Sequence, residues 1–202
     1  MKFSRSGTTI IESIVVMMIV VIGIIGMYSI FINSQNVATS TSNRVQAISM
    51  AREGIEALMN IRDTNWLLFA ANTGNCWHTF NYDGNCILAA SGTTMIQSGS
   101  YIVYQNESNN RWFLSGATSG NYSDINYRNR FRVNIGSGGL YTQSGGENFN
   151  PLFTREIKIS YVDNLSPPQK MKVESIVRWT DSARNSGNYE INLDTILTNW
   201  KK

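Results

Sequence analysis

The sequence has few of the residues on which catalytic and metal sites are usually built. It contains one histidine, two cysteines and three prolines in 202 residues. With His78 as the only histidine, sites that need several imidazole ligands are excluded, and nothing marks a partner for a nucleophilic triad. We therefore predict that the protein is not an enzyme and that it holds no cofactor and no metal.

Charge is also scarce, with a formal net charge of only +3. Arg128, Arg130 and Arg132 alternate along a run that predicts a strand, so they would share one face, with Tyr127 and Phe131 on the other. Such a face could contact phosphate, but the small net charge argues against a nucleic-acid partner. We therefore interpret these arginines as a solvated strand face.

Proline is absent between Ile10 and Trp66. The sequence there predicts a single long helix of roughly 55 residues, about 80 Å at 1.5 Å per residue. Its second part, residues 33–66, begins with a polar section at 33–43 that could instead be a hinge. An apolar stripe at helical spacing then follows, made of Val45, Ile48, Ala51, Ile55, Leu58 and Ile61.

Polar residues are almost missing between Ile14 and Ile32, where Ser29 is the one exception. This run is close to the ~20 residues that a helix needs to cross a bilayer. Glu12 lies near one end of it, where the cost of a charge falls, so we expect the segment to insert. Lys2 and Arg5 precede the run and predict that the N-terminus is cytoplasmic and the remainder outside.

The two cysteines fit an extracytoplasmic location. Cys76 and Cys86 lie in the loop-like stretch "TGNCWHTFNYDGNCIL". Outside the cytoplasm such a pair is expected to be oxidised to a disulfide. A metal site made by the two cysteines and His78 is the alternative, but it lacks a fourth ligand at a usual spacing.

A small residue precedes the apolar run, whereas an ordinary secretory signal places its small cleavage-site residue after it. Gly7 follows a short basic tip, Thr8 comes next, and Glu12 would be the fifth residue of a product cut after Gly7. Together with the apolar run from Ser13 to Ile32, this arrangement resembles the leader of type IV pilins and of the pseudopilins of type II secretion. The pair of segments "AREGIEAL" and "IRDTNW" is similar to a subset of minor pilins of the pilus-modification type.

The resemblance implies a set of partners. A membrane prepilin peptidase would cut after Gly7 and methylate the new amine, although Thr8 stands where the family often has phenylalanine or methionine. Other pilin subunits, an assembly platform and its ATPase would follow. A carboxylate in lipid needs a partner, so we hypothesise that Glu12 of one subunit pairs with the Thr8 amine of a neighbour and fixes the stagger between helices.

The C-terminal two thirds of the chain predicts an antiparallel sheet. The runs with strand character are "SYIVYQ", "RWFLSG", "RFRVNIG", "FTREIKISYV", "MKVESIVRW" and "YEINLDTIL". In the fifth, Met171, Val173, Ser175, Val177 and Trp179 share one face, which would lie on the helix. The fold class is therefore α+β, a long N-terminal helix on an antiparallel sheet, and by resemblance the pilin fold.

Two loops could suggest ligands but do not require them. The glycine-rich stretch at residues 136–146 does not open a helix, so we interpret it as a surface loop and not as a phosphate loop. Asp181, Asn185 and Asn188 lie in the last predicted hairpin turn, where some pseudopilins hold calcium. Asp and Asn are ordinary turn residues, so no ion is needed to explain them.

These observations divide the chain into four parts. Residues 1–7 form a leader, 8–32 a transmembrane and polymerisation helix, 33–66 its amphipathic continuation, and 67–202 an extracytoplasmic β-rich head. The resemblance implies a structural subunit of a type IV pilus or related filament, of the minor kind. The sequence leaves open a secretion pseudopilin, or a membrane-tethered adhesin or binding module that does not polymerise.

Overall fold

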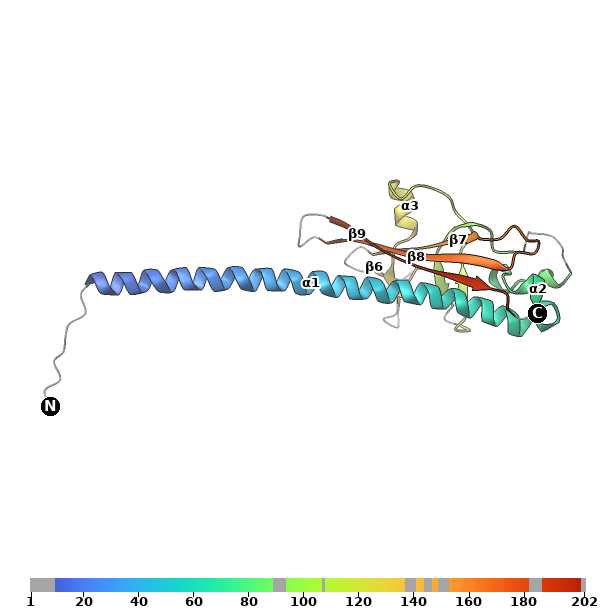
Figure 1. The fold of residues 1–202 in the computed structure, drawn as a ribbon, viewed down its shortest axis with the longest axis horizontal. Coiled ribbons are helices and arrows are strands. Elements are labelled where there is room, and N and C mark those ends of the chain that lie inside the picture. Colours follow the sequence, from blue (N-terminus) through green and yellow to red (C-terminus); the bar gives the residue numbers. More distant parts are fainter. Residues whose placement is uncertain are drawn as a thin grey trace, which may run out of the picture. The chain divides into compact units, whose positions relative to one another are not determined.

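The computed structural model describes residues 10–88, 94–106, 108–136, 141–143, 147–148, 153–181 and 187–200. It is a mixed α+β structure of one long helix and antiparallel strands (Figure 1). The elements in chain order are α1 (Ile10–Leu68), η1 (Ala70–Asn72), α2 (Thr73–Cys76), η2 (Phe80–Tyr82), η3 (Gly84–Ile87), β1 (Gly99–Tyr101), β2 (Val103–Gln105), β3 (Trp112–Leu114), α3 (Ile125–Arg130), β4 (Asn134–Ile135), β5 (Tyr141–Thr142), β6 (Glu147–Asn148), β7 (Thr154–Tyr161), β8 (Lys170–Asp181) and β9 (Gly187–Thr198).

The predicted long helix is present as α1, which has 59 residues. Its backbone stays helical through the polar section at residues 33–43, as expected for a segment without proline. The chain divides into two compact units, residues 1–43 and 44–202. In the first unit the described residues all belong to α1, whereas the second unit contains the rest of α1 and the head.

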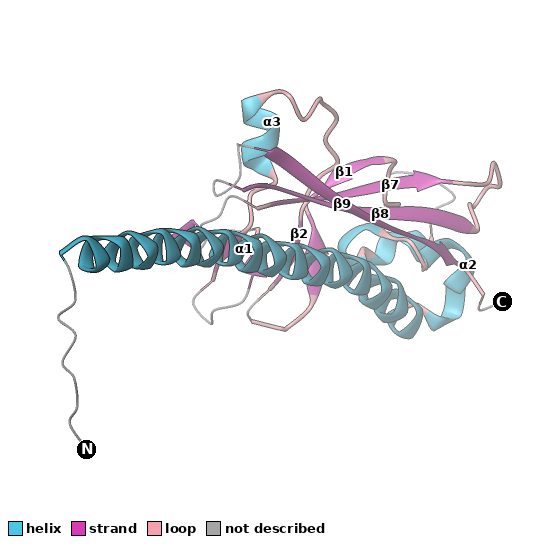
Figure 2. Cartoon of the chain, turned by 60° about the vertical axis from the view of Figure 1, so that its left-hand side comes forward, coloured by secondary structure: helices cyan, strands magenta, loops and turns pink. Residues whose placement is uncertain are grey.

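In the second unit, α1 packs against a four-stranded sheet with the order β1-β7-β8-β9 (Figure 2). All three strand pairings are antiparallel. One part of the core is formed where the helix, the sheet and the loops meet, and it includes Ala57, Leu58, Ile61, Trp66, Trp77, Tyr101, Ile157, Ile159, Met171, Val173 and Leu197. A second part lies nearer the middle of α1 and includes Ala47, Met50, Ala51, Phe153, Val177 and Trp179.

The alternation in β8 confirms the prediction of one buried strand face. The buried set on this face is Met171, Val173, Ser175, Val177 and Trp179. On the other face Lys172, Glu174 and Arg178 are partly exposed, while Ile176 is buried. The period of two residues is therefore the signal that placed this strand correctly.

A glycine lies at a place where α1 approaches the sheet closely. A Cβ atom added at Gly54 would lie 2.5 Å from the Ser175 hydroxyl oxygen and 2.7 Å from Ile157 Cδ1. Ala51, about one turn earlier on this face, and Ala47, about two turns earlier, are fully buried and also small. Glycine lowers helix propensity, and its presence inside α1 is explained by this close packing.

Two strand predictions are wrong in part. The run "SYIVYQ" is divided between β1, which pairs with β7, and β2, which pairs with β3. At the break, the Ile102 amide donates to the Ser115 hydroxyl instead of to a strand. A further small sheet has the order β5-β4-β6.

The predicted arginine strand is the second error, because Ile125–Arg130 forms the helix α3. The Asp124 side chain accepts a hydrogen bond from the Asn126 amide and caps this helix. Tyr127 and Phe131, four residues apart, bring their rings to a centroid distance of 4.9 Å. Figures 1 and 2 show α3 on the side of the sheet opposite to α1. Arginine and aromatic residues alternated in the sequence, but the cap and the helical spacing of the rings determine the local structure.

Candidate functional site

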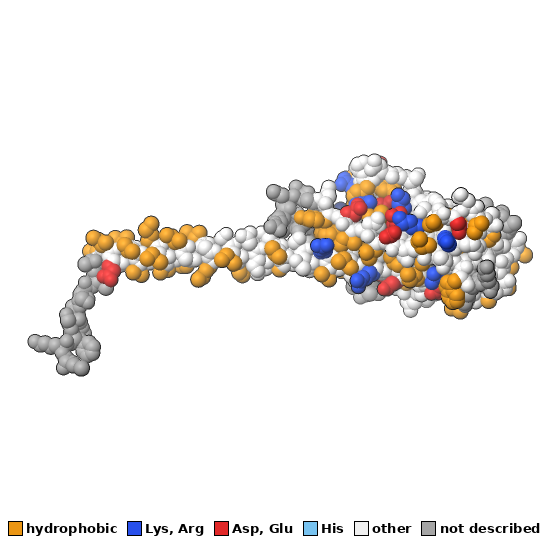
Figure 3. Space-filling model, viewed as in Figure 1, with side chains coloured by type: hydrophobic (Ala, Val, Ile, Leu, Met, Phe, Trp, Pro, Cys, Tyr) orange, Lys and Arg blue, Asp and Glu red, His pale blue; other side chains and the backbone are white. Residues whose placement is uncertain are grey.

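The N-terminal part of α1 exposes apolar side chains along its length, as the face in Figure 3 shows. Large hydrophobic residues from Ile10 to Ile32 range from 40% to 81% exposed. By length and composition α1 is able to cross a membrane. An apolar surface of this extent is unfavourable in water and calls for lipid or for other apolar helices as surroundings.

Glu12 is the acidic residue in the first turn of α1. A carboxylate at this position interacts favourably with the partial positive charge of the helix N-terminus. The predicted processing residues Gly7 and Thr8 lie outside the described residues. The role of Gly7, Thr8 and Glu12 in cleavage and assembly therefore stays a prediction.

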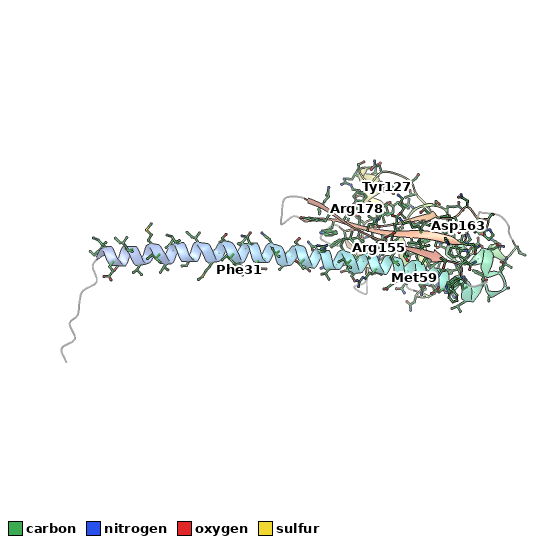
Figure 4. The ribbon with its side chains drawn as sticks, viewed as in Figure 1. Phe31, Met59, Tyr127, Arg155, Asp163 and Arg178 are labelled. Carbon is green, nitrogen blue, oxygen red and sulfur yellow. A yellow bond between two sulfur atoms is a disulfide. The ribbon has the colours of Figure 1, made fainter. Side chains whose placement is uncertain are left out.

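A buried arginine connects α1 to the head. Arg155 on β7 is fully buried, and its guanidinium Nη1 lies 3.0 Å from Glu53 Oε1 on α1. Nη1 also lies 3.4 Å from the Met50 carbonyl oxygen of the same helix. Figure 4 shows Arg155 on the side of the sheet that faces α1.

The other nitrogens of Arg155 are paired as well. Nε donates to Gln143 Oε1 at 3.2 Å, and Nη2 donates to the Val103 carbonyl at 3.3 Å. One guanidinium thus contacts α1, β2 and the Gln143 segment, which fixes these elements around β7. Sequence reasoning missed this site because Arg155 and Glu53 are 102 residues apart.

The disulfide between Cys76 and Cys86 is confirmed. The bridge joins α2 to η3, and both cysteines are buried. Because each sulfur is bonded to the other, the alternative metal site with His78 is wrong. Among the described residues, no group of three His, Cys, Asp or Glu side chains is placed to hold a metal ion.

His78 lies in the core beside this loop. Its ring centroid is 4.8 Å from that of Trp77 and 5.7 Å from that of Tyr161, and its side chain is buried. Burial lowers the pKa of His78 to about 4, although the charge of Asp163 acts in the opposite direction. The imidazole is therefore neutral at physiological pH and serves as a packed aromatic side chain.

The last hairpin differs from the predicted turn. Asp181 belongs to β8 and pairs with Gly187, and Asn188 on β9 pairs with Thr180. Asn185 lies outside the described residues. The predicted loop residues Asp181 and Asn188 are thus strand residues at the end of the β8–β9 ladder.

Comparisons of the chain with protein-family models, with curated proteins and with solved structures found no match.

Proposed function

We propose that the protein is a membrane-anchored prepilin that becomes a minor subunit of a type IV pilus or a related filament. The main observation in support of this proposal is the contrast between the two parts of α1. Its first part is apolar on every side, and its second part is the central element of the head's core. The first part of one continuous helix is thus able to insert into the membrane, and later to pack inside the filament, while the second part is packed in the core of the head.

The order of residues before the helix supports the same proposal. Gly7 and Thr8 precede the apolar run, and Glu12 lies in the first helical turn. Cleavage after Gly7 would leave the anchor intact and create an amine at Thr8, four residues from Glu12. In a bundle of parallel helices, an amine and a carboxylate in apolar surroundings favour the stagger that brings them together.

The head supports an extracytoplasmic location. Its disulfide is typical of an oxidising compartment, and the short positive N-terminal tip favours a cytoplasmic start. In this proposal the protein carries out no reaction and is instead the substrate of the peptidase. Its partners are the peptidase, the assembly platform with its ATPase, and other pilin subunits.

The first test is the N-terminus of the protein extracted from membranes that contain a prepilin peptidase. We expect a start at Thr8 in the wild-type protein and an uncut Met1 start in Gly7→Ala. Gly23→Ala is the matched control, because a Cβ atom at Gly23 meets nothing within 4 Å. An intact Met1 start in the wild-type protein would refute the pilin pathway and favour a tethered binding module.

The second test asks whether Glu12 directs assembly. Glu12→Gln keeps the size of the side chain and removes its charge, so we expect it to reduce the incorporation of this subunit into filaments. Glu56→Gln changes an exposed glutamate on the same helix and is expected to leave incorporation unchanged. Equal incorporation of both variants would contradict the assigned role of Glu12 and leave the processing result untouched.

A further inference from the structure

A cavity of about 390 Å³ lies between α3 and the ends of three strands of the sheet. Its wall is formed by α3 and the residues on either side of it, including Tyr122, Ile125 and Arg132. Its floor is formed by the ends of β7, β8 and β9. This volume falls within the range of about 300–1,000 Å³ that is usual for small-molecule sites.

One of the arginines that line the cavity is already neutralised. Arg178 donates from Nη1 to Glu156 Oε2 at 2.7 Å and from Nε to Glu190 Oε2 at 2.5 Å. Its guanidinium also lies over the Tyr122 ring, 4.2 Å from the centroid. Figure 4 shows Arg178 near Tyr127, whose hydroxyl donates to the same Glu156 carboxylate. Arg178 is therefore a fixed part of the floor.

Two other arginines that line the cavity, Arg128 and Arg132, are not paired with a carboxylate among the described residues. Both side chains are only partly exposed, so solvent screens them less than it screens a fully exposed arginine. Arg130, between them in the sequence, instead donates from Nη2 to the Gly116 carbonyl at 3.0 Å and does not line the cavity.

The rest of the lining offers both donors and acceptors. Asn129, Thr180 and Asn188 are exposed at the rim, and their amides and hydroxyl group can donate and accept hydrogen bonds. The Glu190 carboxylate accepts only, and it is still half exposed after pairing with Arg178. Ile125 adds an apolar surface that is 59% exposed. A ligand that matches this lining needs a negative charge for the arginines and hydroxyl groups that donate to Glu190.

We propose that this cavity binds an acidic monosaccharide unit, with its carboxylate held by Arg128 and Arg132 and its hydroxyl groups held by the amides and Glu190. A guanidinium matches a carboxylate through two parallel hydrogen bonds, and sugar hydroxyls both donate and accept. This inference does not depend on whether the chain polymerises, because every residue in it belongs to the head.

The same observations disfavour the polyanions that arginines also attract. The oxygens of a phosphodiester accept hydrogen bonds but carry no proton to donate, so they cannot pair with Glu190. Three arginines against Glu156 and Glu190 leave one formal positive charge around the cavity. Nucleic-acid affinity comes from many neutralised phosphates along an extended basic surface, and a single net charge supplies little of it.

The test uses the full chain in phosphatidylcholine nanodiscs, so that no sugar-based detergent competes. Binding of D-glucuronate is measured by saturation-transfer NMR and by titration, with D-glucose, inorganic phosphate and a single-stranded DNA oligonucleotide as comparison ligands. We expect glucuronate to bind with a Kd of about 1 mM, as is typical of ligand efficiencies for molecules of this size. Glucose and phosphate are expected to bind at least about tenfold more weakly.

The variants Arg128→Gln and Arg132→Gln are expected to weaken glucuronate binding about tenfold or more each. Arg130→Gln is the matched control, because it removes the same charge from the same segment without changing the cavity, and it should bind as the wild type does. A urea midpoint for each variant establishes that the head is folded.

Three results would overturn the proposal. The first is no saturation transfer to glucuronate at a concentration about tenfold above the expected Kd. The second is an equal loss of binding in Arg130→Gln, which would indicate unspecific attraction of anions. The third is tighter binding of phosphate or of the oligonucleotide than of glucuronate, which would assign the arginines to a polyanion instead.

Discussion

Acidification is expected to destabilise the folded head through His78. The ring is buried between Trp77 and Tyr161, and its pKa falls from 6.5 to about 4 because the charged form is poorly solvated there. In the unfolded chain the imidazole is solvated and takes up a proton at higher pH. The free energy of unfolding therefore has its full value above pH 6.5 and falls as the pH drops towards about 4.

The magnitude follows from the size of the shift. A change of one pKa unit corresponds to about 1.4 kcal/mol, so the shift of His78 contributes about 3 kcal/mol of destabilisation by pH 4. Below that pH the folded protein also binds the proton, and the contribution stays constant. A loss of this size is a large part of the 5–15 kcal/mol that typically holds a domain together.

The assay is urea unfolding of the full chain in nanodiscs, followed by tryptophan fluorescence at a series of pH values. Carboxylates also titrate over this range, so each wild-type value is compared with the value for His78→Phe, which keeps an aromatic ring but cannot be protonated. Between pH 7 and pH 4, the free energy of unfolding of the wild-type protein should fall by about 3 kcal/mol more than that of His78→Phe. A difference that stays constant with pH would refute the buried neutral state of His78.

Three further perturbations test the packing of the head by the same urea assay. Gly54→Ala should lower the free energy of unfolding by about 1–2 kcal/mol, because overpacking against the sheet outweighs the gain in helix propensity; an unchanged midpoint would contradict the close approach. Glu53→Gln should cost about 2 kcal/mol, less than for a fully buried pair because Glu53 is partly exposed, and the cost should disappear in an Arg155→Met background. Replacing Cys76 and Cys86 together by serine should lower the free energy of unfolding by about 3 kcal/mol. An unchanged urea midpoint in this double variant would contradict a stabilising bridge between the two cysteines.

Long, periodic elements were predictable from the sequence. The absence of proline between Ile10 and Trp66 and the apolar stripe after residue 44 were sufficient for α1, which is observed as Ile10–Leu68. The alternation in β8 was sufficient to identify the face that lies on α1. In these elements local propensity and burial require the same conformation, so one pattern determines both.

Short elements and distant contacts were not predictable. The segment around Arg128 and Arg132 alternated as a strand does, but the cap at Asp124 makes it a helix. The pair of Arg155 and Glu53 joins residues that no local pattern relates. The cavity was not predictable for the same reason, because its lining comes from α3 and from three strands that only the folded chain brings together.

The partners of the buried face of α1 have a consequence for the timing of folding. Ala47, Leu58 and Ile61 are covered by β7, β8 and β9, which are synthesised about a hundred residues later. The indole Nε1 of Trp66 also lies within hydrogen-bonding distance of Asn199 Oδ1, close to the last residue of the chain. Contacts of such high sequence separation form slowly, and these can form only after β7, β8 and β9 have been synthesised. Until these strands have been synthesised, the apolar stripe of the new helix has no partner in its own chain and stays exposed.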